Sequence, residues 1–145
     1  MSTSAYPRSP KEQLGGLCHL GRLIDKIRMR HSGLLQEYNY LTTGFDKYLL
    51  DYLGIKGDVL EQRVLEGGTD EEILAWVQGH GKSMTEEEKR QWNEMVLNGE
   101  PKNDMAQGRF NALLTGIAEK RGVSVDQLPK ITKWVEAIDL DEERL

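Results

Sequence analysis

The residues best suited to chemistry gather between positions 22 and 46, where acids, bases and phenols occur within a short stretch. Opposite charges held close together shift the pKa of a carboxylate or a lysine far enough for acid–base work. If the helix that carries the first of these residues packs beside the segment that follows, their side chains converge. The sequence therefore predicts a candidate ligand-binding cluster of Arg22, Asp25, Lys26, Glu37, Tyr38, Tyr40 and Asp46.

The same residues also fit a purely structural role. Arg22 and Asp25 have the i, i+3 spacing of a surface ion pair on a helix, which contributes only ~0.3 kcal/mol. The tyrosines would then pack in the core. This structural role is favoured over catalysis, whereas binding of a ligand or a partner stays open beside it.

The three histidines, His19, His31 and His80, show no metal-binding pattern. No two of them have the i, i+4 spacing of a helical metal site. The single cysteine, Cys18, excludes an internal disulfide and a cysteine-based zinc site. His31 is expected at the edge of the core and His80 in a solvated turn. We expect no metal and no cofactor, and the catalytic residues of any reaction stay unknown.

Two patterns that bind phosphate in other proteins are weak in this chain. The glycines between 15 and 21 precede a helix, but no strand comes before them and no Gly-Lys-Ser/Thr follows. Helices over 58–66 and 70–78 have the lengths of a helix-turn-helix, yet the second begins with the acidic residues 70–72. Because that end would have to approach DNA phosphates, nucleic-acid binding is not expected.

Hydrophobic periodicity predicts helices throughout the chain. Leu20, Leu23, Ile24 and Ile27 occupy one helical face, and glycines or prolines separate the later apolar stripes. Two Thr-x-x-Glu capping boxes, at 69–72 and 85–88, mark helix starts. The predicted helices cover 20–30, 46–53, 58–66, 70–78, the segment between Thr85 and Gly99, the segment from Ala106 to Gly122, and a last helix ending near Ile138.

The predicted fold class is therefore all-α: a compact, single-domain bundle of about seven short helices. One short extended or β segment is expected near residues 36–41, where helical periodicity is weakest. Residues 1–9 are predicted to be a flexible tail, 10–140 a single helical domain and 141–145 an acidic tail. The acidic residues from 139 onward are expected to be solvated.

The chain has 145 residues, a formal net charge of −5 and an uneven charge distribution. Residues 1–33 hold six Lys and Arg against two acidic residues, whereas the rest is acidic. Such a split fits either a nucleic-acid or membrane arm, or a basic segment that packs on an acidic body. The second interpretation is favoured. No apolar run of about 18 residues and no signal-peptide pattern occurs, so no membrane span is expected.

Several segments along the chain form a recognisable series. They are Pro-Arg-Ser-Pro at 7–10, Leu-Gly-Gly at 14–16, Leu-Gly-Arg-Leu-Ile-Asp-Lys at 20–26, Glu-Tyr-Asn-Tyr at 37–40, Glu-Ile-Leu-Ala-Trp-Val at 72–77 and Ile-Asp-Leu-Asp at 138–141. This series resembles a bacterial family known as domain of unknown function 5069. The resemblance covers nearly the whole chain and implies a small soluble protein in a cytoplasmic setting, with no assigned reaction and no catalytic residues to transfer.

These observations favour a binding or interaction module over a catalyst. The alternative is a small enzyme or ligand-binding protein that uses the polar cluster around Arg22 and Glu37. The expected partners are a small anionic ligand, another protein, or a second copy of the chain. For a homodimer, Trp92 and Met95 are the candidate surface patch.

Overall fold

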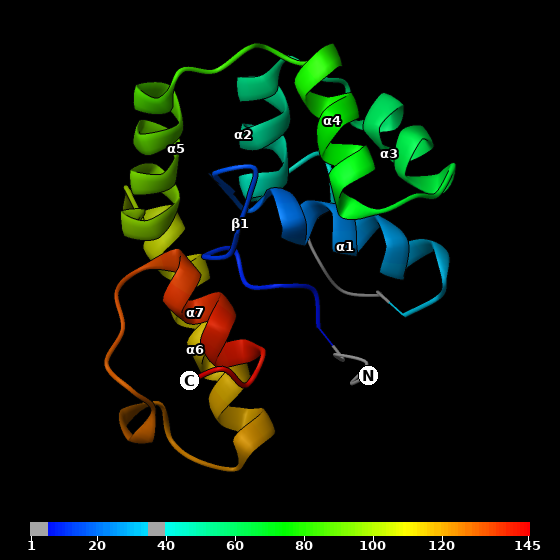
Figure 1. Cartoon of the computed structure of the whole chain (residues 1–145). Coiled ribbons are helices and arrows are strands. Elements are labelled where there is room, and N and C mark those ends of the chain that lie inside the picture. Colours follow the sequence, from blue (N-terminus) through cyan, green and yellow to red (C-terminus); the bar gives the residue numbers. More distant parts are fainter. Residues whose placement is uncertain (1–5, 35–39) are drawn as a thin grey trace. The chain divides into compact units, whose positions relative to one another are not determined.

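The computed structural model describes residues 6–34 and 40–145, and helices dominate this part of the chain (Figure 1). The mainly helical fold that the sequence predicts is confirmed. No described helix is long and apolar enough to cross a membrane. The helices are Leu20–His31 (α1), Gly44–Leu53 (α2), Gly57–Leu65 (α3), Asp70–His80 (α4), Glu86–Asn98 (α5), Asp104–Arg121 (α6) and Trp134–Asp141 (α7), with a 3₁₀ turn at Val125–Gln127 (η1).

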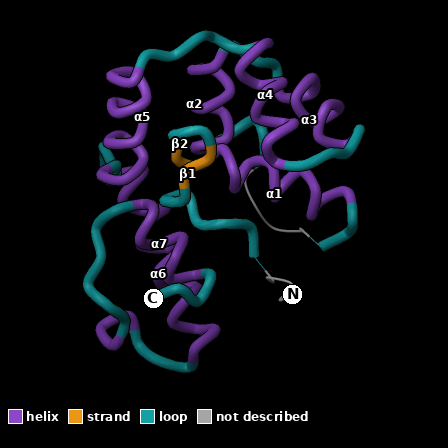
Figure 2. Tube along the Cα trace, viewed as in Figure 1, coloured by secondary structure: helices purple, strands orange, loops and turns teal. Residues whose placement is uncertain are grey.

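Strand structure in the described residues is confined to one short antiparallel hairpin, drawn in orange in Figure 2. Its strands, Gln13–Leu14 (β1) and Leu17–Cys18 (β2), are joined by Gly15 and Gly16. Both glycines have positive φ, 62° and 81°, which the tightest two-residue hairpin loop requires. Sequence analysis missed this hairpin. The extended segment that the sequence predicts near 36–41 lies mostly outside the described residues. Residues 40–41, which are described, form no strand.

The chain divides into two compact units, Met1–Val96 and Leu97–Leu145, with the boundary in the last turn of α5. In the first unit, the predicted apolar face of α1 is confirmed, because all four of its residues are fully buried. Helix α3 packs against both α1 and α4 (Figure 1). The single domain predicted over 10–140 stays a prediction.

The second unit is built from α6, η1 and α7. Its core contains Ile117, Ala118, Leu128 and Leu140, with Leu113 and Leu114 packed against them. The Phe110 ring meets the Trp134 ring edge-on, with centroids 5.2 Å apart. The long apolar stripe of α6 that the sequence predicts is thus in the core of this unit.

The expectation of a solvated C-terminus is wrong for part of the segment 139–145. Helix α7 continues to Asp141, and Asp139, Leu140 and Glu142 are buried. The guanidinium of Arg144 lies 3.3 Å from the Asp139 carboxylate and 2.7 Å from that of Glu142. This counter-charge offsets part of the cost of removing two carboxylates from water.

Both predicted capping boxes are present. The Thr69 hydroxyl accepts from the Glu72 N–H while the Glu72 carboxylate accepts from the Thr69 N–H, and Thr85 and Glu88 form the same reciprocal pair. These caps fix where α4 and α5 begin. The start of α4 matters for the ion-pair network described below.

Candidate functional site

The centre of the first unit holds a buried polar cluster around Asp46, in the first turn of α2. His19 Nε2 lies 2.6 Å from Asp46 Oδ1, and Lys26 Nζ lies 3.2 Å from both carboxylate oxygens. The Leu41 N–H donates to Asp46 Oδ2 at 3.0 Å. The side chains of His19, Lys26 and Asp46 are only 2, 5 and 0% exposed. Through these contacts, the Asp46 carboxylate of α2 connects to Lys26 of α1, to His19 just before α1 and to Leu41 before α2.

The charges within this cluster balance. Burial raises the pKa of Asp46, but the hydrogen bond with His19 and the positive charge of Lys26 outweigh burial and hold that pKa below its usual value. Burial lowers the pKa of His19, more than Asp46 raises it. We therefore assign a carboxylate, an ammonium and a neutral imidazole. His19 precedes α1 in the left-handed region, with φ 74°, and its Nδ1 has no hydrogen-bond partner among the described residues.

The predicted ligand-binding cluster is only partly assembled. Lys26 and Asp46 meet, but Asp25 pairs instead with Arg8. Arg22 is buried, 3% exposed, so the alternative of a surface Arg22–Asp25 pair is wrong. Helical geometry explains the split, because neighbouring positions on α1 point about 100° apart. Two further members, at positions 37 and 38, lie outside the described residues.

The last member, Tyr40, belongs to a separate, partly exposed cluster. Its hydroxyl donates to Glu61 of α3, and His31 Nε2 lies 3.1 Å from the same carboxylate oxygen. The Arg30 guanidinium lies over the Tyr40 ring, 4.5 Å from its centroid. Burial, and then Glu61, raise the pKa of Tyr40. His31 itself is exposed, so its expected place at the core edge is wrong.

Two other sequence expectations have clear outcomes. His80 is exposed, but it is the last residue of α4 and stacks on Trp76 with ring centroids 4.3 Å apart. Trp92 is buried, and its indole N–H donates to the Cys18 carbonyl at 2.9 Å. The predicted Trp92–Met95 surface patch is therefore wrong, since only Met95 is exposed.

In the described residues, no three His, Cys, Asp or Glu side chains form a group that could hold a metal.

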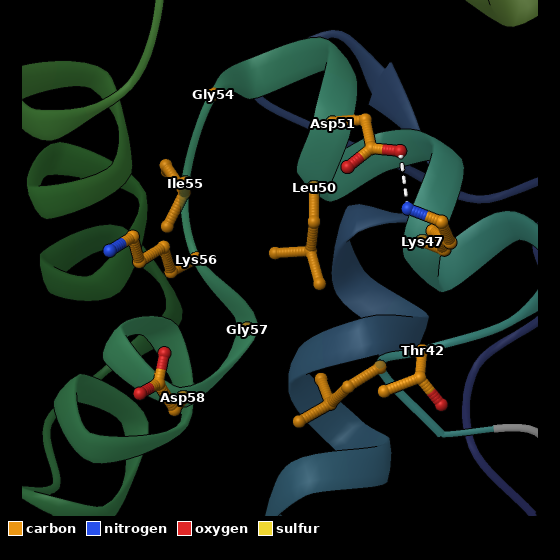
Figure 3. Close-up of a pocket in the computed structure, with 10 residues that line it drawn as sticks. Thr42, Lys47, Leu50, Asp51, Gly54, Ile55, Lys56, Gly57 and Asp58 are labelled. Atoms are coloured by element: carbon orange, nitrogen blue, oxygen red, sulfur yellow. Dashed lines mark hydrogen bonds and ion pairs between the residues drawn. The ribbon is translucent and has the colours of Figure 1, made fainter.

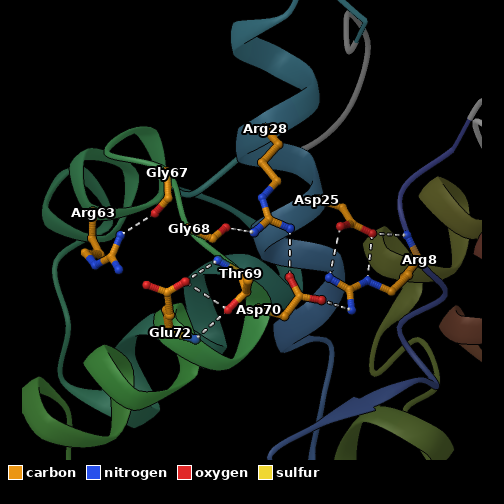
Figure 4. A network of polar contacts seen from close by, with 9 residues as sticks. All are labelled: Arg8, Asp25, Arg28, Arg63, Gly67, Gly68, Thr69, Asp70 and Glu72. Atoms are coloured by element: carbon orange, nitrogen blue, oxygen red, sulfur yellow. Dashed lines mark hydrogen bonds and ion pairs between the residues drawn. The ribbon is translucent and has the colours of Figure 1, made fainter.

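An ion-pair network joins the segment before the hairpin to α1 and α4 (Figure 4). Arg8 makes a bidentate pair with Asp25, at 2.9 and 3.0 Å, and a second pair with Asp70 at 2.9 Å. Asp70 also pairs with Arg28 at 2.7 Å. Part of the predicted flexible tail is thus packed, with Ser9 only 7% exposed. These cations pair with aspartates of the same unit, as expected for a basic segment folded onto an acidic body.

Gly21 makes room for the Arg8 guanidinium on α1. A Cβ at position 21 would lie 2.9 Å from Arg8 Cζ and 3.1 Å from both Nε and Nη1. Within a helix, alanine normally exceeds glycine in stability by ~1 kcal/mol. We expect the opposite here: Gly21→Ala should lower the free energy of unfolding by about 1 kcal/mol, because it displaces charge-assisted hydrogen bonds. Urea denaturation measures this change.

The matched control is the same substitution in an Arg8→Ala background. Without the guanidinium, Gly21→Ala should stabilise the protein by about 1 kcal/mol, the ordinary helix preference. A destabilising effect of equal size in both backgrounds would show that Gly21 serves some contact other than Arg8.

A groove of about 600 Å³ opens on the surface between α2 and the start of α3 (Figure 3). Its apolar part is formed by Leu41 and Leu50. The opposite wall is the main chain of residues 54–57, since the side chains of Ile55 and Lys56 point away from α2 (Figure 3). We call this feature the α2–α3 groove.

Charged and hydroxyl side chains surround the apolar part of the α2–α3 groove. Lys47 Nζ lies 2.9 Å from Asp51 Oδ2 on one rim, Thr42 lies beside them, and Asp58 lines the far end. The buried Asp46 reaches this groove indirectly, because it holds the Leu41 N–H. Sequence analysis did not predict the groove, since nothing in the periodicity of α2 and α3 specifies a gap between their ends.

Gly57 borders the α2–α3 groove where the two walls approach each other. A Cβ there would lie 3.3 Å from Leu50 Cδ1 and 3.4 Å from Leu41 Cβ. The glycine is not required by a positive φ, because residue 57 does not lie in the left-handed region. Its absent side chain keeps this end of the groove from being filled.

Comparison with known proteins agrees with this description of a fold without a recognised reaction. No curated protein matches the chain. A family model described as a domain of unknown function, DUF5069, matches residues 4–144. The matched range includes the Arg8 network, the buried Asp46 cluster and the α2–α3 groove. The chain belongs to the DUF5069 family.

Proposed function

We propose that the protein is a binding module that takes an extended peptide segment of a partner protein into the α2–α3 groove. The observation that carries the proposal is the groove itself. Its volume of about 600 Å³ lies within the range of ligand-binding sites. It combines an aliphatic surface with a wall of main-chain groups.

The chemistry of the two walls supports a peptide as occupant. Leu41 is half-buried and offers apolar area to an aliphatic side chain, beside the buried Leu50. Such a side chain gains ~0.8 kcal/mol for each methylene that it buries. The first N–H groups of α3, at Gly57 and Asp58, precede the first bond within that helix and face no helical acceptor. A peptide carbonyl is a suitable acceptor for them.

The charge of the groove supports the same occupant. Lys47 and Asp51 neutralise each other on the rim, and the remaining charged residues, Lys56 and Asp58, are one of each sign. A polyanion would find no net positive field there. An uncharged peptide backbone requires none.

The buried Asp46 cluster gives less support to an enzyme. Its carboxylate already accepts hydrogen bonds from His19, Lys26 and the Leu41 N–H, and its side chain is fully buried. A substrate would have to displace these partners before it reached the carboxylate. The cluster instead supports the groove, because it positions Leu41.

A phage library of randomised heptapeptides, selected against the full chain, tests the proposal. Enriched peptides should carry an aliphatic residue and bind with micromolar affinity. A spin label attached to such a peptide should broaden the methyl resonances of Leu41 and Leu50. Gly57→Val, which fills the narrow end of the groove, should weaken binding at least tenfold.

The control is Gly79→Val, the same substitution on the exposed surface of α4, where a Cβ meets no atom within 4 Å. This variant should bind the selected peptides as the wild type does. Peptides that bind both variants equally, or that broaden other methyl groups, would refute the assignment to the groove.

Light scattering decides whether a second copy is the partner. A mass that doubles with concentration, and that returns to one chain in Gly57→Val, would place a second copy in the groove instead of a foreign peptide. A constant single-chain mass leaves the peptide proposal as stated.

A further inference from the structure

A second, smaller cavity of about 200 Å³ lies beside the β1–β2 hairpin. It shares no lining residue with the α2–α3 groove. Leu17, Leu74, Val77 and Met84 form its apolar lining. We call it the hairpin pocket.

The hairpin that forms one wall is held firmly. Asn93 of α5 donates to the Gly16 carbonyl at 2.9 Å and accepts from the Cys18 N–H at 2.8 Å. The Trp92 indole N–H donates to the Cys18 carbonyl. These three bonds hold the turn and β2, so this wall is in place before any ligand arrives.

The first glycine of the turn lets the pocket residue Leu74 pack directly against the hairpin. A Cβ on Gly15 would lie 2.5 Å from Leu74 Cδ1, and one on Gly16 would lie 3.4 Å from Lys89 Cδ. Any side chain at these positions would meet α4 or α5 residues that line the pocket. Gly15 therefore serves both the backbone geometry of the turn and the close packing of Leu74 in the pocket wall.

The charged residues in the lining of the hairpin pocket are both lysines. Lys82 and Lys89 line it together with the amide of Gln78 and the hydroxyl of Ser83. Lys82 Nζ also lies 2.7 Å from Glu88 and Lys89 Nζ lies 3.7 Å from Glu86, two glutamates outside the lining. Each ammonium has three donors, so pairing with one glutamate leaves donors for a second acceptor.

From this combination we infer that the hairpin pocket binds a small monocarboxylate with a short alkyl chain. The alkyl chain of the ligand would lie on Leu17, Leu74 and Val77, and its carboxylate would meet Lys82 and Lys89. At about 30 Å³ for a group the size of a water molecule, the pocket holds about seven such groups. Hexanoate therefore matches its size.

A titration series on the full chain, followed through leucine and valine methyl resonances, tests the inference. The probes are acetate, butanoate, hexanoate and decanoate at low ionic strength. Affinity should rise about fourfold for each buried methylene and stop rising beyond hexanoate, because the pocket is then full. The shifted methyl groups should be those of Leu17, Leu74 and Val77.

1-Hexanol separates the contribution of the carboxylate charge to binding from that of the alkyl chain. It should bind more than tenfold more weakly than hexanoate. The double variant Lys82→Met, Lys89→Met should lose at least tenfold in hexanoate affinity and keep its affinity for hexanol. Lys47→Met, a lysine of the α2–α3 groove, should bind hexanoate as the wild type does.

Three results would overturn the inference. The first is equal affinity for hexanol and hexanoate, the second is unchanged hexanoate binding by the double variant, and the third is methyl shifts on Leu41 and Leu50. The last result would assign the carboxylate to the α2–α3 groove. Failure of the peptide selection would not affect the hairpin pocket, since the two sites are probed by different methyl groups.

Discussion

Replacing Asp46 by asparagine is expected to lower the free energy of unfolding by about 3 kcal/mol or more. The substitution keeps the size of the side chain but removes its negative charge. Lys26, with 5% of its side chain exposed, then lies beside a neutral amide instead of a carboxylate 3.2 Å away. Two of the hydrogen bonds from His19, Lys26 and Leu41 also change partners or weaken. Urea denaturation followed by circular dichroism measures the loss.

The matched control is Asp51→Asn, one turn further along α2. Asp51 pairs with Lys47 at 2.9 Å, but both side chains are more than half exposed. Exposed pairs of this kind contribute about 0.5 kcal/mol or less. A similar loss for both variants would mean that burial of the Asp46 cluster has no energetic consequence.

A double-mutant cycle assigns the loss to the pair itself. Lys26→Met leaves Asp46 without its cation, and the double variant Lys26→Met, Asp46→Asn removes both charges. We expect the double variant to lose clearly less stability than the sum of the two single variants, because no buried charge faces a missing partner. Strict additivity would show that Lys26 and Asp46 act independently.

The helices could be predicted from the sequence because their signals are local. The α1 stripe of Leu20, Leu23, Ile24 and Ile27 repeats at helical spacing, and capping boxes mark the starts of α4 and α5. The hairpin was missed for the opposite reason. Strands of two residues show no alternation, so Gly15 and Gly16 alone carried the signal, and two adjacent glycines also fit a flexible joint.

The candidate site could be predicted only in part, because it depends on contacts far apart in the sequence. Lys26 and Asp46, two members of the predicted cluster, do lie 3.2 Å apart, whereas ligand binding by that cluster stays a prediction. His19 was missed because it lies just before α1, in a left-handed conformation that no periodicity reveals. Arg8 was assigned to a tail, although it pairs with aspartates 17 and 62 positions away. Nothing local to Arg8 identifies those partners.

The segments on which the sequence resembles the family acquire a structural explanation from these contacts. In the segment 20–26, Gly21 makes room for Arg8, Asp25 pairs with Arg8, and Lys26 pairs with Asp46. The backbone carbonyl of Arg8 accepts from Arg22 at 3.1 Å. The early motifs therefore contact one another, and the chemistry-bearing residues that sequence analysis singled out mainly hold the first unit together.

Acidification is expected to destabilise the protein through His19. An unfolded histidine has a pKa near 6.5, whereas burial lowers the pKa of His19 in the folded protein. Below pH 6.5 the unfolded chain therefore binds a proton that the folded protein does not. The free energy of unfolding should therefore fall as the pH drops from 7.5 to 5.5 because of this one group. Urea denaturation across that pH range measures the slope.

The variant His19→Asn isolates this contribution from that of every other titrating group. Asparagine tolerates the left-handed conformation better than other non-glycine residues, and its amide does not titrate. Asp46, whose pKa is lowered, loses its stabilising charge only at more acidic pH, near and below 4. The difference between the two stability curves should therefore grow as the pH falls from 7.5 to 5.5. Parallel curves would mean that the pKa of His19 is the same in the folded and the unfolded protein. A pH dependence of the opposite sign would mean that His19 carries a proton in the folded protein, and the cluster would then hold two cations against one carboxylate.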